Sequence, residues 1–178
     1  EGSYQLPAQV VANSFLNFRF PGKEEEKMSK SRGTAVWIEE YLKTFDPDPL
    51  RYYLTAIAPE GQRTAFNVDD FLARNNTELL NVLGNFVNRT LTFAQRYFEG
   101  KVPDAGRRGP VDLEQISAIG EQAAKAAENL DAFHFKAALG NVMDLARRAN
   151  GYFDAKQPWK QRKDDMAGCD TTINVCIQ

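Results

Sequence analysis

The chain has 178 residues, of which 43% are hydrophobic, so it can form one ordinary domain plus a smaller attached segment around a buried core. Its formal net charge of −2 argues against a uniformly basic surface, and any RNA must therefore be bound by selected side chains. No apolar run approaches the roughly 20 residues of a membrane-spanning helix, and the start resembles no signal peptide. We expect a cytoplasmic protein with no membrane contact.

The cysteines and the histidine do not suggest a metal site. Cys169 and Cys176 are seven residues apart, which on a helix is too far along the axis for a disulfide. Burial as small apolar residues is the simpler interpretation. His134 is the one histidine of the chain, which makes a four-ligand zinc site hard to assemble. We predict no metal site.

Short, mixed elements are expected in the first third of the chain. Residues 6–16 form a Val-rich apolar run without a helical stripe, which predicts one buried strand. Residues 17–32 are polar and contain Pro21-Gly22 and the run Glu24–Glu26, which predicts an exposed, mobile loop. A short helix over 37–42 follows. A second helix begins at the capping segment 46–49 and ends before Pro59.

The rest of the chain reads as helices. Asn67 or Asp69 caps a long helix that ends near Gly100, and Asp112 begins an Ala-rich helix that runs to about Asn129. A further helix spans about 130–152, and a last one follows Pro158-Trp159. The predicted fold class is mainly α, with a small mixed α/β segment over 1–66 followed by a bundle of about four helices over 67–178.

Lys27-Met28-Ser29-Lys30-Ser31 places two ammonium groups and two hydroxyls on the predicted loop. That combination suits a polyphosphate whose charge shifts during a reaction, and a lysine on a mobile loop can close on the transition state. An ordinary basic surface loop is the alternative.

The pentapeptide resembles the signature loop of class I aminoacyl-tRNA synthetases, and the sequel Arg32-Gly33-Thr34 with Leu50–Leu54 is similar to methionyl-tRNA synthetases in particular. The resemblance implies that Lys30 contacts the phosphates of ATP, accompanied by Mg²⁺, and stabilises pyrophosphate as methionyl adenylate forms. It also implies that Lys27 and Ser29 assist loop closure. Residues 18–26 depart from the family's compact glycine turn because they are longer and more acidic.

A second candidate site lies in the helical part. Asn85 and Arg89 are four residues apart, so they share a helix face and can offer amide and guanidinium donors to base edges. Pro158 breaks a helix ahead of Trp159, where an RNA base could stack on the indole. A plain polar face and a core tryptophan are the respective alternatives. The neighbouring Lys156, Lys160, Arg162 and Lys163 could hold RNA phosphates.

The resemblance extends to residues 83–89, 149–152 and 158–159, which look like the family's anticodon-binding helices. It implies that Asn85, Arg89 and Trp159 recognise the CAU anticodon of methionine tRNA, chiefly its first base. The family's His-x-Gly-His segment, methionine pocket and zinc knuckle have no counterpart in this sequence. We therefore expect a fragment that is inactive alone and meets ATP and methionine only with the missing catalytic domain.

Two alternatives stay open. One is a non-catalytic helical RNA-binding or protein-interaction module, in which the lysine loop is surface decoration and Trp159 lies in the core. The other is a synthetase of the same class for another amino acid, which fits the lysine loop but fits Leu50–Leu54 and Pro158-Trp159 less well.

Overall fold

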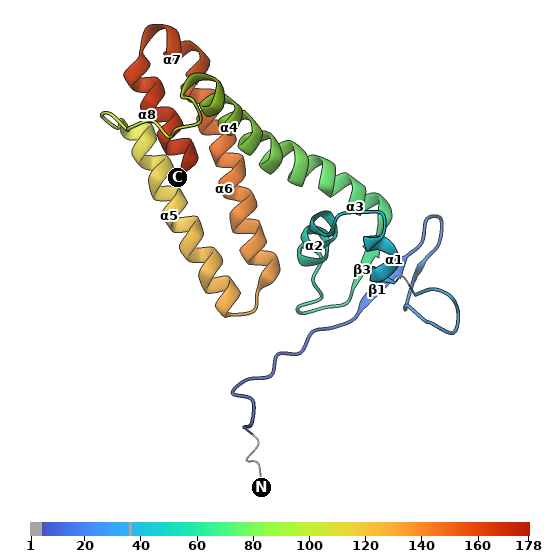
Figure 1. Ribbon diagram of the computed structural model, residues 1–178. Coiled ribbons are helices and arrows are strands. Elements are labelled where there is room, and N and C mark those ends of the chain that lie inside the picture. The colour runs from blue at the N-terminus through green and yellow to red at the C-terminus, as the bar shows by residue number, and fades with distance from the viewer. Residues whose placement is uncertain (1–4, 36) are drawn as a thin grey trace.

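A computed structural model describes residues 5–35 and 37–178. The predicted fold class is confirmed: a small mixed sheet with short helices precedes a larger all-helical part (Figure 1). The central strand β1 (Leu16–Arg19) pairs antiparallel with β2 (Glu25–Glu26) and parallel with β3 (Thr64–Asn67). The parallel pair forms because α1 and α2 carry the chain from one end of the sheet back to the other.

The strand prediction over 6–16 is wrong in position and in burial. The strand begins at Leu16, and the preceding apolar residues are open to solvent, with Leu6 90% and Val10 80% exposed. Figure 1 shows this segment extending away from the rest of the chain. Apolar periodicity reports a tendency to be buried, but the described residues provide no surface that covers residues 6–11.

The loop prediction over 17–32 is wrong in its first part. Residues 16–26 form a hairpin, which turns at Pro21-Gly22, where Gly22 has φ 71° and the Lys23 amide donates to the Phe20 carbonyl at 3.0 Å. Glycine adopts such a positive φ at little cost. The irregular loop that carries the lysines is therefore shorter than expected and starts after Glu26.

Two helices cover the sheet region: α1 (Ile38–Leu42) and α2 (Pro47–Ala56). Asp46 occupies the N-cap position of α2 as predicted, but its side chain makes no capping hydrogen bond within the described residues. The α2 residue Tyr53 is fully buried, and its hydroxyl donates to Asp70 Oδ2 at 2.9 Å. Its ring meets Phe66 of β3 edge-on, with centroids 4.9 Å apart, so α2 is fixed against both the sheet and the next helix.

One long helical run then leaves the sheet. It comprises α3 (Val68–Arg74), a π-helical segment η1 (Asn75–Gly84) and α4 (Asn85–Tyr97). The predicted cap is confirmed, since Asn67 Oδ1 accepts from the Asp69 and Asp70 amides at 2.9 and 3.2 Å. The π-helical middle was not predicted. Asn150 donates to the Val82 carbonyl at 2.9 Å, and a side chain bonded to a helical carbonyl can disturb the regular ladder.

The remaining helices are α5 (Pro110–Asp131), α6 (Phe135–Lys156), α7 (Pro158–Asp164) and α8 (Met166–Ile177). Helices α5 and α6 form an antiparallel hairpin, and α4 and α8 pack on it to complete a four-helix bundle (Figure 1). The last predicted helix is two helices, because Asp165 ends α7 and caps α8 by accepting from the Gly168 amide at 3.0 Å. None of the helices among the described residues has the length and hydropathy needed to cross a membrane.

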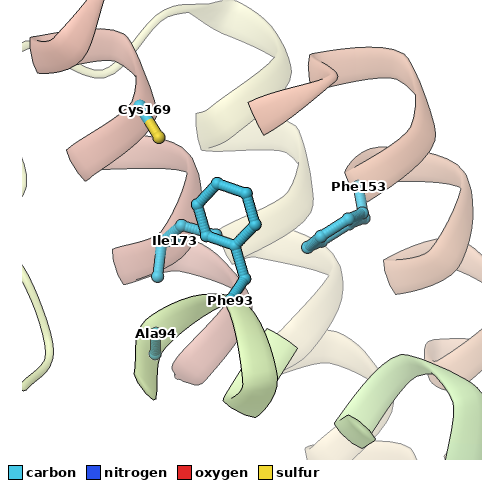
Figure 2. Packing of buried hydrophobic residues seen from close by; sticks show 5 residues of the cluster. All are labelled: Phe93, Ala94, Phe153, Cys169 and Ile173. Atoms are coloured by element: carbon cyan, nitrogen blue, oxygen red, sulfur yellow. The ribbon is translucent and has the colours of Figure 1, made fainter. Parts of the chain in front are cut away.

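The bundle core brings together α4, α6 and α8. Figure 2 shows the Phe93 ring between Phe153 and Ile173, with Cys169 on the same side as Ile173. The rings of Phe93 and Phe153 are nearly perpendicular, at 88°, with centroids 6.4 Å apart. Cys169 is fully buried and not disulfide-bonded, as predicted, and burial raises the pKa of its thiol to about 11. The core thus fixes α4 relative to the end of α6.

Candidate phosphate loop and RNA-binding face

The lysine loop is closed by its own backbone. The Thr34 amide donates to the Ser29 carbonyl at 3.0 Å, and the Ser29 amide donates to Thr34 Oγ1 at the same distance. Between them, Gly33 has φ 68° and donates to the Lys30 carbonyl at 3.2 Å. A residue with a side chain would be strained at this φ. Lys30 therefore lies at the tip of a tight turn, and Ser29 lies at its base.

The side chains of the loop differ in burial. Met28 lines an apolar cavity of about 730 Å³ between β1, α1, α2 and α3, whereas Lys27 and Lys30 are exposed. Lys30 Nζ lies 4.8 Å from the ring centroid of Trp37, and Lys27 Nζ lies 5.7 Å from that of Phe15. The two ammonium groups are thus available to an anionic ligand from solvent.

The acidic approach to the loop is partly ordered. Glu25 and Glu26 belong to β2, and Glu25 Oε1 accepts from Asn17 Nδ2 at 2.6 Å. This hydrogen bond engages one of the three carboxylates of Glu24–Glu26 with the neighbouring strand β1. The acidic segment that departs from the family's compact glycine turn is thus part of the hairpin, and at least one of its carboxylates is already hydrogen-bonded.

In the helical part, Arg89 and Trp159 both pack on the aromatic ring of Phe153, which the sequence did not predict as part of the site. The Arg89 guanidinium carbon lies 4.5 Å from the ring centroid of Phe153, and the Trp159 ring centroid lies 6.0 Å from it. Arg89 Nη2 also donates to Asp154 Oδ1 at 2.5 Å. Side chains from α4, α6 and α7 are thus brought to one surface.

The turn before Trp159 is set by the backbone. Helix α6 ends at Gln157, which adopts the left-handed conformation with φ 49°, and Pro158 then occupies the first position of α7. Trp159 is 41% exposed, so the alternative of a core tryptophan is wrong. One part of the indole packs towards Phe153, and the other part is open to solvent.

Asn85 is exposed and begins α4, one helical turn before Arg89. The structure therefore keeps Asn85 and Arg89 on neighbouring turns, as their spacing predicted. The contact through Phe153 joins Arg89 and Trp159, while Asn85 is linked to them only by its position on α4.

The basic residues near Trp159 fall into two groups. Lys156 Nζ pairs with the buried Asp112 Oδ1 at 2.8 Å, so its charge is already engaged within the bundle. Arg162 is exposed, and its guanidinium carbon lies 4.3 Å from the ring centroid of Tyr97 on α4. Lys160 and Lys163 are exposed on the same short helix.

Comparison with known proteins assigns the chain to a family. The family model described as tRNA synthetases class I (M) matches residues 1–91. The chain belongs to the methionyl-tRNA synthetase family. It is 43% identical over its full length to a methionine–tRNA ligase of Pyrococcus abyssi and 45% identical to one of Bacteroides fragilis. A solved structure of Mycobacterium tuberculosis methionyl-tRNA synthetase with methionyl-adenylate superposes on 97% of the chain with a TM-score of 0.85 and 30% identity.

The chain spans about a quarter of the two ligases, 24% of the Pyrococcus abyssi protein and 26% of the Bacteroides fragilis protein, and 34% of the solved Mycobacterium tuberculosis chain. Within the described ranges, no group of three His, Cys, Asp or Glu residues is placed to hold a metal ion. The alternative of a class I synthetase for another amino acid is excluded, because the matching family and relatives are the methionyl type.

Phe153 and Asp154 belong to the candidate site and were not predicted from the sequence. Both follow Tyr152 in a segment that the family resemblance had already marked, but their contacts with Arg89 join residues 64 and 65 positions apart in the chain. The indicative signal was an aromatic residue and a carboxylate close before the helix break at Pro158.

Proposed function

We propose that this chain is the part of a methionine–tRNA ligase that reads the CAU anticodon of methionine tRNA and supplies the ATP-phosphate loop. The observation that carries the RNA-binding part is the convergence of Arg89 and Trp159 on Phe153, in a chain of the methionyl-tRNA synthetase family. Asn85 extends the same face by one turn of α4.

The geometry suits an unstacked RNA base. The open part of Trp159 offers a stacking surface, and aromatic stacking on a base stabilises binding by roughly 1–3 kcal/mol. Arg89 donates one of its five N–H groups to Asp154, whose side chain is 59% exposed. The other N–H groups of Arg89 are therefore available to hydrogen-bond a base edge. Stacking of Arg89 on Phe153 fixes the plane of the guanidinium before RNA arrives, which lowers the entropy cost of binding.

The backbone of the RNA would be held by cations beside this surface. Arg162 lies on the same helix as Trp159, and its stacking on Tyr97 orients its donors without pairing its charge. Lys160 and Lys163 add positive charge to the short helix. Such contacts position an RNA without reading its sequence.

The loop would act on the phosphates of ATP. Lys30 at the tip of the turn stabilises the negative charge that develops on pyrophosphate when the methionine carboxylate displaces it, while Lys27 and Ser29 assist closure. Mg²⁺ takes many of its ligands from substrate phosphates and water. This chain would therefore contribute the charge of Lys30 to the bound nucleotide, while Lys27 and Ser29 assist closure of the loop.

Adenylate formation also requires a methionine pocket and an adenosine site, which we place in the part of the parent ligase that this chain does not span. The isolated chain is then catalytically inactive. We assign residues 1–66 to the end of the catalytic domain and residues 67–178 to the anticodon-binding domain. The helix cap at Asn67 lies at this division.

Binding of a methionine-anticodon stem-loop to three proteins tests the proposal: the natural chain, Trp159→Ala and Phe135→Leu. Phe135 is 38% exposed and lies at the opposite end of α6, so its variant controls for the loss of an exposed aromatic ring. We expect Trp159→Ala to bind at least about fivefold more weakly with unchanged helical content, and Phe135→Leu to bind normally. Equal binding by all three would favour the alternative, a helical interaction module without an anticodon site.

A further inference from the structure

Trp37 occupies a fixed position beside the lysine loop. It is the N-cap residue of α1, and its carbonyl accepts from the Glu40 amide at 3.1 Å and the Tyr41 amide at 3.3 Å. These bonds attach the backbone of Trp37 to the helix. Trp37 is 50% exposed, so a large part of its apolar surface is in contact with water.

The exposed ring has a charged partner. Lys30 Nζ lies 4.8 Å from the Trp37 ring centroid, within the distance at which the negative face of an indole attracts a cation. Lys27 makes a similar, longer contact with Phe15, at 5.7 Å. Both lysines of the loop therefore rest on aromatic rings that belong to segments outside the turn formed by Ser29 to Thr34.

We propose that Trp37 holds Lys30 in a resting position, and that a polyphosphate must draw the ammonium off the indole as the loop closes. This inference rests on the proposed role of Lys30. The ring is attached to α1, whereas Lys30 lies at the tip of the turn, so movement of the tip towards a ligand separates the two groups. Trp37 is thus a positioning residue that opposes phosphate binding and limits how readily the empty loop closes.

The strength of the contact sets the size of the effect. A cation on an exposed aromatic face is stabilised weakly, so its removal should tighten phosphate binding by about two- to fivefold. The ring also gives the contact a spectroscopic signature. Because the ε-methylene group is bonded to Nζ, which lies over the indole, its protons should resonate upfield of those of an ordinary lysine.

The test is titration of the 178-residue chain with inorganic tripolyphosphate at fixed low ionic strength, by calorimetry and by NMR of Lys30. Trp37→Leu keeps an apolar side chain without the indole face, and Trp37→Phe keeps a weaker aromatic face. Phe45→Leu is the control, because Phe45 is 60% exposed near the end of α1 and its ring packs on Tyr41 instead of a lysine. Circular dichroism confirms that each variant is folded.

We expect Trp37→Leu to bind about two- to fivefold more tightly, Trp37→Phe to lie in between, and Phe45→Leu to match the natural chain. Saturating tripolyphosphate should return the Lys30 ε-methylene resonance to the ordinary lysine position. Unchanged or weaker binding by Trp37→Leu, or an upfield shift that persists at saturation, would overturn the inference.

Lys30→Ala separates this inference from the function on which it rests. If Lys30→Ala loses most of the binding while Trp37→Leu behaves as the natural chain, the phosphate role of Lys30 stands and the role of Trp37 fails. If Lys30→Ala binds tripolyphosphate as well as the natural chain does, the proposed role of Lys30 is wrong and the inference is overturned with it.

Discussion

Substitution of Asp112 tests how the bundle holds the turn that presents Trp159. The carboxylate is 3% exposed and accepts from three donors: the Gly109 amide at 2.8 Å, the Tyr152 hydroxyl at 2.7 Å and Lys156 Nζ at 2.8 Å. Asp112→Asn removes the charge and places an amide group against one of these donors. Loss of one partner of a buried ion pair costs about 3–5 kcal/mol. Since Lys156 is 20% exposed and water reaches it, we expect the lower end, about 3 kcal/mol.

Urea unfolding followed by circular dichroism measures this loss. The matched controls are Lys156→Met alone and the double variant Asp112→Asn with Lys156→Met. Because each single variant leaves a buried polar group without its partner, the double variant should lose less stability than the sum of the two. A loss below about 1 kcal/mol for Asp112→Asn, or strictly additive losses, would refute the view that this pair fixes the end of α6.

The pair of Asp112 and Lys156 also makes the stability of the fold depend on pH. Burial raises the pKa of Asp112, but the hydrogen bonds from Lys156, Tyr152 and the Gly109 amide outweigh burial and leave the pKa below its ordinary value. A lowered native pKa stabilises the fold above the unfolded pKa of about 3.9, and this stabilisation disappears as the pH falls through the native pKa. The natural chain should therefore lose more stability than Asp112→Asn when the pH is lowered below about 4.

Three further predictions concern RNA binding, catalysis and the thiols. Arg162→Ala should weaken binding of cognate and altered stem-loops equally and reduce the slope of log affinity against log salt by about 0.7–0.9, whereas Arg148→Ala, which removes an arginine paired with Glu114, should leave the slope unchanged. The isolated chain should catalyse no methionine-dependent exchange of pyrophosphate into ATP; measurable exchange would contradict the assignment of the methionine pocket to the rest of the ligase. Burial raises the pKa of Cys169 to about 11 and of Cys176 to about 12, so a thiol reagent should react slowly with the native chain and rapidly after unfolding, and equal rates in both states would show that the thiols are accessible.

Features determined by neighbouring residues could be predicted from the sequence. The Asn67 cap needs only the two amides that follow it, and the break at Pro158 needs only a ring that cannot continue the helix. The tight turn behind Lys30 also depends on nearby residues, Gly33 and Thr34, but the sequence analysis predicted only a mobile loop there. Such local signals located both candidate sites.

Features that depend on distant partners could not be predicted. Strand β3 forms because residues 64–67 lie beside β1, and its four residues carry no strong alternation of their own. The π-helical segment before Asn85 is bonded by Asn150 from α6, 68 positions after Val82. The contact of Arg89 and Trp159 with Phe153 arises in the same way, because it exists only once α4 packs on α6.

The most direct test of the account is the affinity of this chain for two stem-loops at one salt concentration: one with the CAU anticodon, and one changed only at the first anticodon base. Anticodon reading through Asn85, Arg89 and Trp159 predicts clearly tighter binding of the CAU stem-loop, and loss of that preference in Trp159→Ala. Equal affinity for both stem-loops, measured on folded protein, would contradict the central claim.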